Sequence, residues 1–249
     1  MILTIDIGNT HIVTGILDEN GTLLLKFRST SNRALTEDEY FSTLKSLGDF
    51  HEINLKKIQG IIVSSVVPSL IEIFQYFGKK YFSMEPIIVS KDLFLPFELN
   101  IPTLGADRII NLAQCSLKYP NKNILIFDLG TATTYDILKN NTYLGGGIIP
   151  GIQMAINSLS EKTAKLPKID FKKKDNVIGT NTIDQLESGI YFGYLGQIKN
   201  IIEEVKKIIP DIHVISTGGL GNLPLEEINE YLPNISLDGL FTLYNLNKK

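Results

Sequence analysis

Two short apolar segments of the chain end in the same way. Residues 2–10 read ILTIDIGNT and residues 124–132 read ILIFDLGTA. In each, aliphatic and β-branched residues predict a buried strand, and Asp, one aliphatic residue and Gly follow at its end. The two aspartates, Asp6 and Asp128, lie close to half of the 249-residue chain apart. The pattern therefore predicts one strand–turn unit that occurs twice.

The segments that follow these two turns are also alike. Residues 11–27 form two strand-like runs around polar residues 18–21, and residues 133–149 form two runs around residues 139–141. Such polar residues between alternating apolar runs predict β-hairpins. A repeat of this length is too long for a solenoid unit. We therefore expect two similar α/β halves that face each other, at residues 1–118 and 119–249.

Strand-like and helix-like patterns alternate through the rest of the chain. Strands are predicted at residues 58–67, 85–90 and 213–219, and helical spacing occurs at residues 68–82, 105–119 and 182–209. Pro68 suits the first turn of a helix, Thr182 and Gln185 have the spacing of a capping box, and Pro210 ends the last helix. This alternation predicts an α/β fold with a mixed sheet, flanked by helices, in each half.

Composition and charge narrow the class of protein. Apolar residues make up 43% of the chain, and 24 basic against 27 acidic residues give a net charge of −3, which provides no general basic field for nucleic acid or membrane lipid. One cysteine excludes an internal disulfide framework, and three dispersed histidines argue against a histidine-based metal cluster. The chain starts without a signal-peptide pattern and has no apolar run long enough to span a membrane. We expect a soluble, cytoplasmic globular protein.

One lysine-rich stretch has two interpretations. Residues 162–175 contain six lysines. Such a run is usually a solvated loop, and the alternative is a mobile flap near an anionic ligand.

The two aspartate turns have the chemistry of phosphate sites. Gly8 lets the backbone after Asp6 turn sharply and approach a ligand, and the N–H groups around Asn9 and Thr10 can donate to phosphate oxygens. A carboxylate repels bare phosphate, so it becomes useful only with a cation between them, such as Mg²⁺. The segment 128–134 follows the same logic with three threonine hydroxyls. Each turn alone is common, whereas the pair could clamp a triphosphate and its metal.

Two further segments carry candidate chemistry. No G-x-x-x-x-G-K-[ST] motif and no G-x-G-x-x-G motif after a strand occurs in the sequence. The glycine-rich turn 217–222 is either a contact for adenine or ribose or a plain tight turn. In Gly105-Ala106-Asp107-Arg108, an acid in the first helical turn is commonly stabilised by the helix dipole. Alternatively, Asp107 accepts a proton from a substrate hydroxyl and Arg108 holds a substrate carboxylate or phosphate.

These motifs together resemble the type III pantothenate kinases of the acetate and sugar kinase/Hsp70/actin superfamily. The resemblance runs the whole chain and ends with a tail, 237–247, that looks like the family's C-terminal helix. The duplicated halves agree with the two ribonuclease-H-like domains of that superfamily, which flank a nucleotide cleft. The motifs that carry the resemblance are D-x-G-N-T at 6–10, G-A-D-R at 105–108, D-x-G-T-A-T-T at 128–134, G-G-G-I-I-P-G at 145–151, G-T-N-T at 179–182 and T-G-G at 217–219.

The resemblance implies ATP-dependent phosphorylation of pantothenate on its primary hydroxyl to 4'-phosphopantothenate, the first step toward coenzyme A. It implies Asp107 as proton acceptor, Asp128 as ligand of a monovalent cation, K⁺ or NH₄⁺, and Asp6 on the Mg²⁺ side. It also implies a homodimer in which Thr182 reaches pantothenate from the partner subunit. The implied ATP contacts are Asp6, Ile7, Gly8, Asn9, Thr10, His11, Ile12, Val13 and Thr131, and the implied pantothenate contacts are Gly105, Ala106, Asp107, Arg108 and Thr182.

Local sequence bears on parts of this picture. Gly189, Gly193 and Gly196 form one strip of the predicted helix 182–209, which allows close approach either of a partner helix or of another part of the same chain. The stretch 96–104 lacks the tyrosine that many members of the family carry before G-A-D-R. His11 has no chemical role that follows from its neighbours.

Two other functions remain open at this point. One is a different small-molecule kinase or phosphatase of the same superfamily, which would share the Asp6 and Asp128 turns but not G-A-D-R. The other is a regulatory factor that binds nucleotide on the same scaffold without catalysis, which loss of the Asp107 carboxylate would favour. A substrate screen separates the first alternative, and turnover as opposed to ATP binding separates the second.

Overall fold

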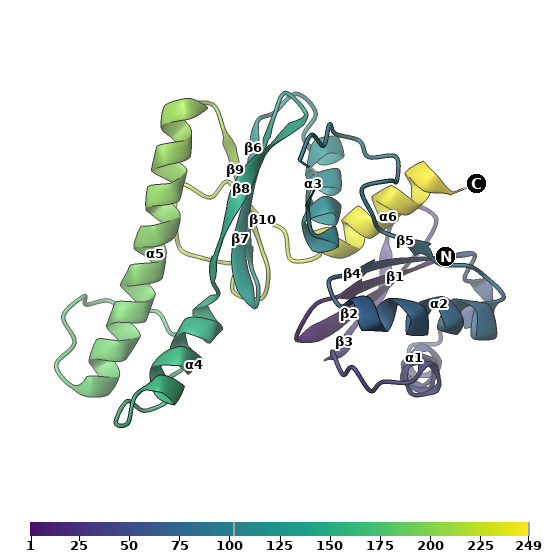
Figure 1. The fold of residues 1–249 in the computed structure, drawn as a ribbon, viewed down its shortest axis with the longest axis horizontal. Helices are drawn as coiled ribbons and strands as arrows, with labels where there is room; N and C mark the ends of the chain where they lie inside the picture. Colours follow the sequence, from purple (N-terminus) through teal and green to yellow (C-terminus); the bar gives the residue numbers. More distant parts are fainter. Residues whose placement is uncertain (102, 249) are drawn as a thin grey trace. The chain divides into compact units, whose positions relative to one another are not determined.

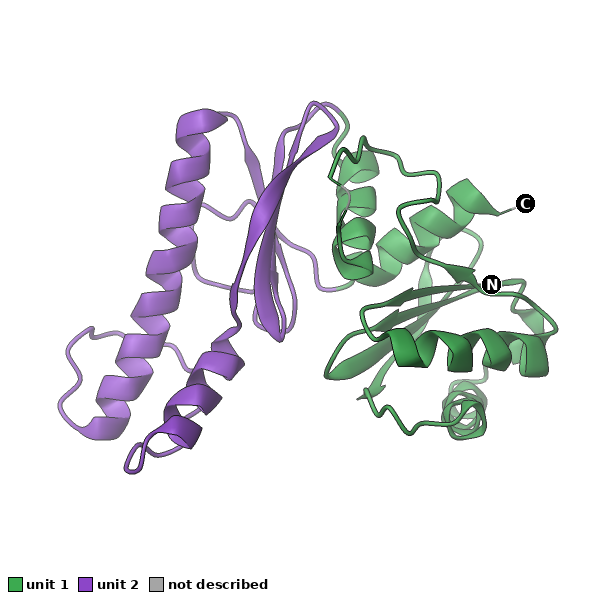
Figure 2. Cartoon of the chain, in the orientation of Figure 1, with its two compact units in different colours: residues 1–120, 234–249 green, residues 121–233 purple. Residues whose placement is uncertain are grey.

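The computed structural model describes residues 1–101 and 103–248, and the chain divides into two units (Figure 1, Figure 2). Unit 1 comprises residues 1–120 and 234–249, and unit 2 comprises residues 121–233. The first boundary falls two residues beyond the one expected from sequence. The C-terminal helix, however, belongs to unit 1, whereas the expected division placed it in the second half.

Each unit contains one five-stranded mixed sheet. The strand order is β3-β2-β1-β4-β5 in unit 1 and β10-β9-β6-β7-β8 in unit 2, which is the same order read in the opposite direction. In both sheets the first three strands along the chain are antiparallel neighbours, and the last two run parallel to the central strand. The predicted pair of similar halves with mixed sheets is confirmed. The strands are β1 Ile2–Ile7, β2 His11–Leu17, β3 Leu23–Thr30, β4 Gly60–Ser65, β5 Ile87–Ile88, β6 Ile124–Leu129, β7 Ala132–Lys139, β8 Thr142–Pro150, β9 His213–Thr217 and β10 Glu230–Tyr231.

The register puts the two aspartates at equivalent places. Asp6 is the fifth residue of the six-residue strand β1, and Asp128 is the fifth residue of the six-residue strand β6. Asp6 is paired with Ser64 of the parallel neighbour β4, and Asp128 is paired with Thr217 of the parallel neighbour β9. Asp6 and Asp128 therefore lie at the carboxyl end of the central strand, each in the sheet of its own unit.

Unit 1 has helices on both faces of its sheet (Figure 1). Helices α1 Glu37–Phe50 and α2 Pro68–Phe82 cover one face through a core that includes Ile5, Phe74 and Phe77. Helices α3 Ala106–Lys118 and α6 Ile235–Asn247 pack together over β1 and β4. Gly239 of α6 makes this close approach possible, because a Cβ there would lie 2.1 Å from the carbonyl oxygen of Ile110. This contact is the physical reason why the C-terminal helix belongs to unit 1.

Unit 2 has helices α4 Ile152–Lys162 and α5 Thr182–Ile208 against its sheet. They cover the face that carries Leu125, Phe127 and Leu129, through a buried core that continues along α5 as Tyr194, Ile198 and Ile202. No helix among the described residues is long and apolar enough to cross a membrane.

The sequence-based elements agree with the structure in most places. The helices predicted at 68–82, 105–119 and 182–209 are present, each within one residue of the predicted ends, whereas the strand predicted at 85–90 shortens to the two-residue β5. Helices α1 and α4 were not predicted. A capping box at Thr36, confirmed by hydrogen bonds with Glu39, is the sequence signal that identifies α1.

The start of α5 corrects one prediction. Thr182 was expected to cap this helix with Gln185, but the cap is Asn181, whose side chain accepts from the N–H of Asp184 at 3.1 Å. Asn is a somewhat better N-cap than Thr, and the extended backbone at Asn181 places it at the cap position. Thr182 is therefore the first helical residue, with its side chain left exposed.

The lysine-rich segment 162–175 is largely exposed and mostly outside regular structure. Its end is held in place, because the ammonium of Lys174 donates to Asp184 at 2.5 Å and to Glu187 at 3.1 Å, both on α5. Ile169 is also buried within the unit 2 core. The segment thus combines a solvated surface with two anchors.

Candidate functional site

The first aspartate turn is a tight connection between β1 and β2. The N–H of Gly8 donates to the carbonyl of His11 at 2.9 Å, and a Cβ at Gly8 would lie 3.2 Å from that carbonyl oxygen. Asn9, Thr10 and His11 are exposed at the tip, whereas the carboxylate-bearing Asp6 is half-buried. The turn therefore offers exposed donors beside a partly desolvated carboxylate.

The residues expected to line ATP at this turn differ in what they can offer. The side chains of Ile7 and Ile12 are fully buried in the core of unit 1. Only their backbone groups can take part in a ligand contact. Exposed His11 has a pKa below its ordinary value, first because its ring is partly desolvated and second because of the nearby charge of Arg28. His11 thus takes up a proton less readily than an ordinary exposed histidine, and Arg28, which the sequence analysis did not single out, adds positive charge near the turn.

The G-A-D-R segment lies at the same edge of unit 1 as the first turn. Gly105 is the N-cap of α3, and its Cβ position lies 4.0 Å from Cγ1 of Val66. The N–H of Val66 in turn donates to the carbonyl of Ile7 at 3.0 Å, directly after Asp6. Val66, the residue directly after β4, therefore lies beside both the start of α3 and the end of β1. From the sequence, Val66 was predicted only as part of the strand at residues 58–67.

Asp107 has the electrostatics of a proton acceptor. Its carboxylate is half-buried, and desolvation raises its pKa, while the backbone N–H and the charge of Arg108 act in the opposite direction. The Oδ1 atom accepts from the N–H of Arg108 at 2.8 Å. A Cβ at Gly105 would lie 2.4 Å from this same Oδ1, so only glycine at position 105 leaves the carboxylate its place. A raised pKa makes the carboxylate a stronger base than an exposed aspartate.

The second aspartate turn has a cradle built from two glycines. The Oδ1 atom of Asp128 lies 3.4 Å from the Cβ position of Gly130 and 2.7 Å from that of Gly218. Gly218 has a φ of +87°, a conformation that favours glycine. The glycine-rich turn 217–222 therefore packs directly against the Asp128 carboxylate.

The end of β8 packs on the same turn of unit 2. A Cβ at Gly151 would lie 2.1 Å from the carbonyl oxygen of Thr131 and 2.7 Å from that of Gly130. Gly151 is also the N-cap of α4, and no side chain caps this helix. The exposed Thr131 therefore lies next to the start of α4, where backbone N–H groups favour an anion.

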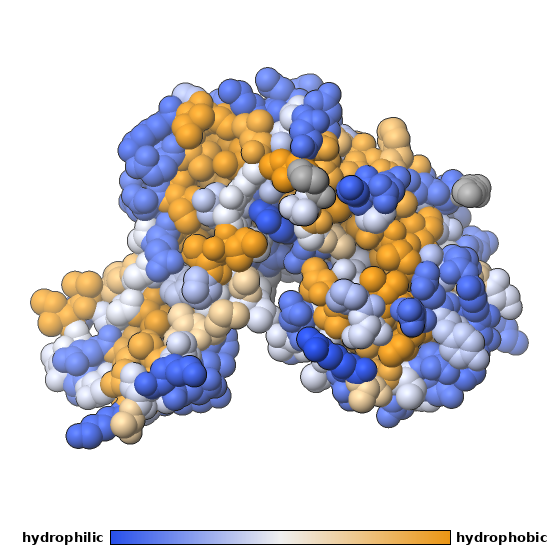
Figure 3. Space-filling model, in the orientation of Figure 1, coloured by the Kyte–Doolittle hydropathy of each residue, from blue (hydrophilic) through white to orange (hydrophobic). Residues whose placement is uncertain are grey.

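The strip of glycines on α5 faces open space. No described atom lies within 4 Å of the Cβ positions of Gly189, Gly193 and Gly196, apart from their own neighbourhood in the chain. Packing of this strip within the described part of the chain is thereby excluded. Near the start of the same helix, Ile178 is 78% exposed and Ile183 is 51% exposed. Figure 3 shows hydrophobic residues at the surface in the region of α4 and the start of α5.

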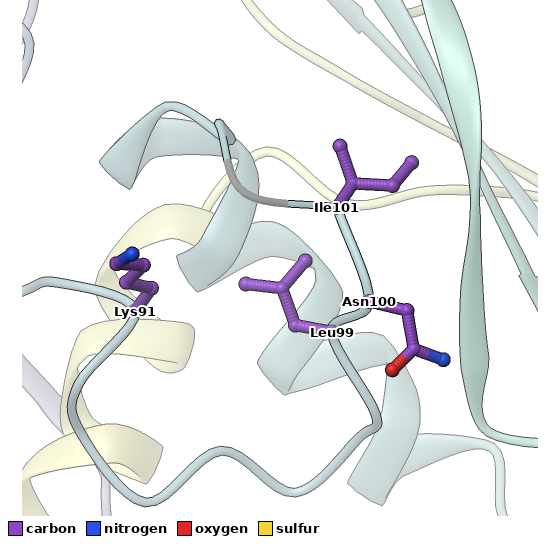
Figure 4. Close-up of a pocket in the computed structure, with 4 residues that line it drawn as sticks. All are labelled: Lys91, Leu99, Asn100 and Ile101. Atoms are coloured by element: carbon purple, nitrogen blue, oxygen red, sulfur yellow. The ribbon is translucent and has the colours of Figure 1, made fainter.

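A small pocket lies in the loop before G-A-D-R (Figure 4). It is lined by Lys91, Leu99, Asn100 and Ile101. In Figure 4 the side chain of Leu99 points toward the part of the loop that carries Lys91, and the side chain of Asn100 points away from Lys91. None of the residues predicted for ATP or pantothenate lines it. The pocket therefore lies between residues 99–101 and Lys91, in the loop that precedes α3.

The described residues hold no group of three or more His, Cys, Asp or Glu side chains that could bind a metal ion together. Mg²⁺ in phosphoryl-transfer sites is usually held by one or two carboxylates, substrate phosphates and water. A single half-buried carboxylate beside an exposed glycine turn, as at Asp6, fits this chemistry. The Asp128 carboxylate, set against the two glycines Gly130 and Gly218, fits a second cation site.

Comparison with known proteins gives the family. A family model described as type III pantothenate kinase matches residues 2–204. The chain belongs to the type III pantothenate kinase family. A type III pantothenate kinase from Fusobacterium nucleatum is 51% identical, and one from Exiguobacterium sibiricum is 38% identical, with each alignment covering 100% of both chains.

The fold is also found in solved structures. A candidate N-acetylmannosamine kinase from Listeria monocytogenes superposes with a TM-score of 0.56 and 12% identity over 98% of each chain. At this identity the likeness shows the fold alone. The resemblance inferred from the ordered motifs is thus confirmed at the level of family and fold, and the type III pantothenate kinase family is a family of enzymes.

Proposed function

We propose that this chain transfers the terminal phosphoryl group of ATP to the primary hydroxyl of pantothenate. Membership of the type III pantothenate kinase family supports both the donor and the acceptor. The observation that carries the proposal is the placement of Asp107 at the same edge of unit 1 as the Asp6 turn, through the two contacts of Val66. The proposed base, Asp107, and the proposed phosphate-binding turn after Asp6 are thereby held by one sheet and one helix. This fixed arrangement favours in-line transfer.

Asp107 is proposed as the acceptor of the substrate hydroxyl proton. Its raised pKa and its place beside the Asp6 turn support this role. Arg108, the next residue, is proposed to hold the pantothenate carboxylate, because a guanidinium binds carboxylates with two parallel hydrogen bonds. Gly105 and Ala106 are proposed to contact pantothenate by their backbone.

ATP is proposed to bind the segment from Asp6 to Val13 and Thr131. Exposed donors at Asn9 and Thr10 and the α4 start beside Thr131 support phosphate contacts. Asp6 is proposed to lie on the Mg²⁺ side and Asp128 to hold K⁺ or NH₄⁺. Bound cations neutralise phosphate charge during the transfer, while the protein residues orient the reactants.

A homodimer with Thr182 of one subunit at the pantothenate site of the other is also proposed. Open space over the glycine strip of α5 and the exposure of Ile178 and Ile183 support a partner at this helix. Subunit complementation tests it: equal amounts of Asp107→Asn and Thr182→Ala protein are mixed and reassociated. A shared site restores about a quarter of wild-type activity, since half of the dimers are mixed and each holds one intact site. No recovery, despite proven exchange of subunits, would contradict a shared site.

The first experiment measures phosphopantothenate formation by purified protein with ATP and Mg²⁺, in K⁺, NH₄⁺ and Na⁺ buffers. We expect product in K⁺ and NH₄⁺ and hardly any in Na⁺. Absence of product in all three buffers, with ATP binding intact, would overturn the proposed reaction. A cytoplasmic location stays a prediction that cell fractionation can test.

Asp128→Asn separates the cation role from a structural turn. We expect a raised K⁺ requirement, because an amide lacks the charge that attracts the cation. Asp170→Asn is the matched control, since Asp170 is an exposed aspartate of the same unit. An unchanged K⁺ titration in Asp128→Asn would reassign Asp128 to a structural role.

A further inference from the structure

The Gly218 turn is fitted closely against the Asp128 carboxylate. At its φ of +87°, Gly218 has a Cβ position 2.6 Å from the carbonyl oxygen of Leu129 and 2.7 Å from Oδ1 of Asp128. The backbone of Gly218 is thus one wall of the space in which this carboxylate is held. Any shift of Gly218 changes the room available to Asp128.

Two donors fix the carbonyl oxygen of Gly218. The N–H of Gly221 donates to it at 3.1 Å and closes the turn. The hydroxyl of Tyr231 donates to it at 3.1 Å from outside the turn. The Tyr231 ring also packs on the turn, since its Cε2 atom lies 2.9 Å from the Cβ position of Gly221.

Tyr231 reaches the turn from a minimal strand. β10 consists of Glu230 and Tyr231 alone, with Tyr231 paired to Ser216 of β9. A second side-chain hydrogen bond joins the two strands, because the hydroxyl of Thr217 donates at 2.7 Å to the carbonyl of Leu232, the residue directly after β10. These hydrogen bonds tie β10 to the end of β9, where the Gly218 turn begins.

We propose that Tyr231 is a positioning residue that holds the Gly218 turn against Asp128 and thereby sets the affinity of this turn for the monovalent cation and for ATP. The proposal rests on the proposed function of Asp128. Tyr231 acts through the Gly218 carbonyl and has no part in the phosphoryl transfer itself. Its loss is therefore expected to affect binding at the Asp128 turn rather than the chemical step.

The test is Tyr231→Phe, which keeps the ring that packs on Gly221 and removes only the hydroxyl. The matched control is Tyr244→Phe in unit 1, which also removes a tyrosine hydroxyl that donates to a backbone carbonyl, that of Gln59 at 3.3 Å. For each protein we would measure kcat, KM for ATP and the half-saturating K⁺ concentration. Calorimetric binding of a non-hydrolysable ATP analogue with Mg²⁺, in K⁺ and in Na⁺ buffers, provides a readout that is independent of turnover.

We expect Tyr231→Phe to raise the half-saturating K⁺ concentration, and the dissociation constant of the analogue in K⁺, by about three- to tenfold, the effect of one lost hydrogen bond. The value of kcat at saturation stays close to wild type, and Tyr244→Phe leaves both affinities unchanged. In an Asp128→Asn background, Tyr231→Phe adds no further change in K⁺ requirement, because the two residues act as one unit.

Suppose that the wild type requires K⁺ and binds the analogue more tightly in K⁺ than in Na⁺. If Tyr231→Phe then has the same K⁺ requirement and the same analogue affinity as the wild type, the positioning role is overturned and the proposed function stands. Equal effects of Tyr231→Phe with and without the Asp128 carboxylate would also overturn it, since the action would not pass through Asp128. A wild-type protein that binds the analogue equally in K⁺ and Na⁺ would remove the cation site from the proposed function, and this inference with it.

Discussion

Replacement of Asp107 by Asn tests the proposed base with little change in shape. Asn has the same size, and its side-chain oxygen can still accept from the N–H of Arg108, which donates to Oδ1 of Asp107 at 2.8 Å. What it loses is the ability to take a proton. General-base catalysis contributes about 10²- to 10⁴-fold, so turnover is expected to fall by that factor, which corresponds to about 3–5 kcal/mol of transition-state stabilisation.

The stability of this variant is expected to change in the opposite direction. Desolvation raises the pKa of Asp107 in the folded state above its ordinary value near 3.8. The folded protein thus binds the proton more tightly than the unfolded chain, and the ionised carboxylate costs stability at neutral pH. Asn carries no such cost. We expect Asp107→Asn to be at least as stable as wild type at pH 7, with the difference shrinking as the pH falls through the raised pKa toward 3.8.

The assay combines steady-state turnover with urea unfolding at several pH values. In wild type, kcat/KM is expected to fall on the acid side with an inflection above the ordinary aspartate pKa, as Asp107 becomes protonated. Asp92→Asn, an exposed aspartate of the same unit, is the control and leaves turnover and stability unchanged. Wild-type turnover in Asp107→Asn would refute the role of Asp107, and a large loss of stability at pH 7 would refute the electrostatic reasoning.

Two further predictions concern stability, measured by urea unfolding. Gly151→Ala is expected to lower the free energy of unfolding by about 1–3 kcal/mol, because its Cβ would lie 2.1 Å from the carbonyl oxygen of Thr131. Gly219→Ala is the control, since a Cβ at Gly219 meets nothing within 4 Å. Equal losses in the two variants would contradict the steric explanation. Tyr40→Phe is expected to cost about 1–3 kcal/mol, because the fully buried Tyr40 hydroxyl bonds Thr14 Oγ1 at 2.6 Å and its loss leaves that atom without a partner. An unchanged midpoint for Tyr40→Phe would show that Thr14 finds another partner.

The sequence alone determined the features that depend on neighbouring residues. The short runs of aliphatic and β-branched residues before Asp6 and before Asp128 predicted both buried strands, because such a run is read from neighbouring positions. Gly21 and the pair Asn140-Asn141 adopt positive φ values, as the predicted hairpin turns require. The order of the short motifs was sufficient to identify the family, since each motif is read from a few adjacent positions.

Only the tertiary structure decided what depends on contacts between distant residues. The C-terminal helix belongs to unit 1 because Gly239 lets it meet the backbone of α3, a contact between residues 110 and 239 that no local pattern encodes. β5 and β10 are two-residue strands that exist only through their pairing with β4 and β9. In the same way, the sequence indicated a glycine-rich turn at 217–222, but the structure placed Gly218 against the Asp128 carboxylate and Tyr231 against Gly218. Glycine and tyrosine are compatible with many environments, so their role follows from which atoms the fold brings within hydrogen-bond or van der Waals distance.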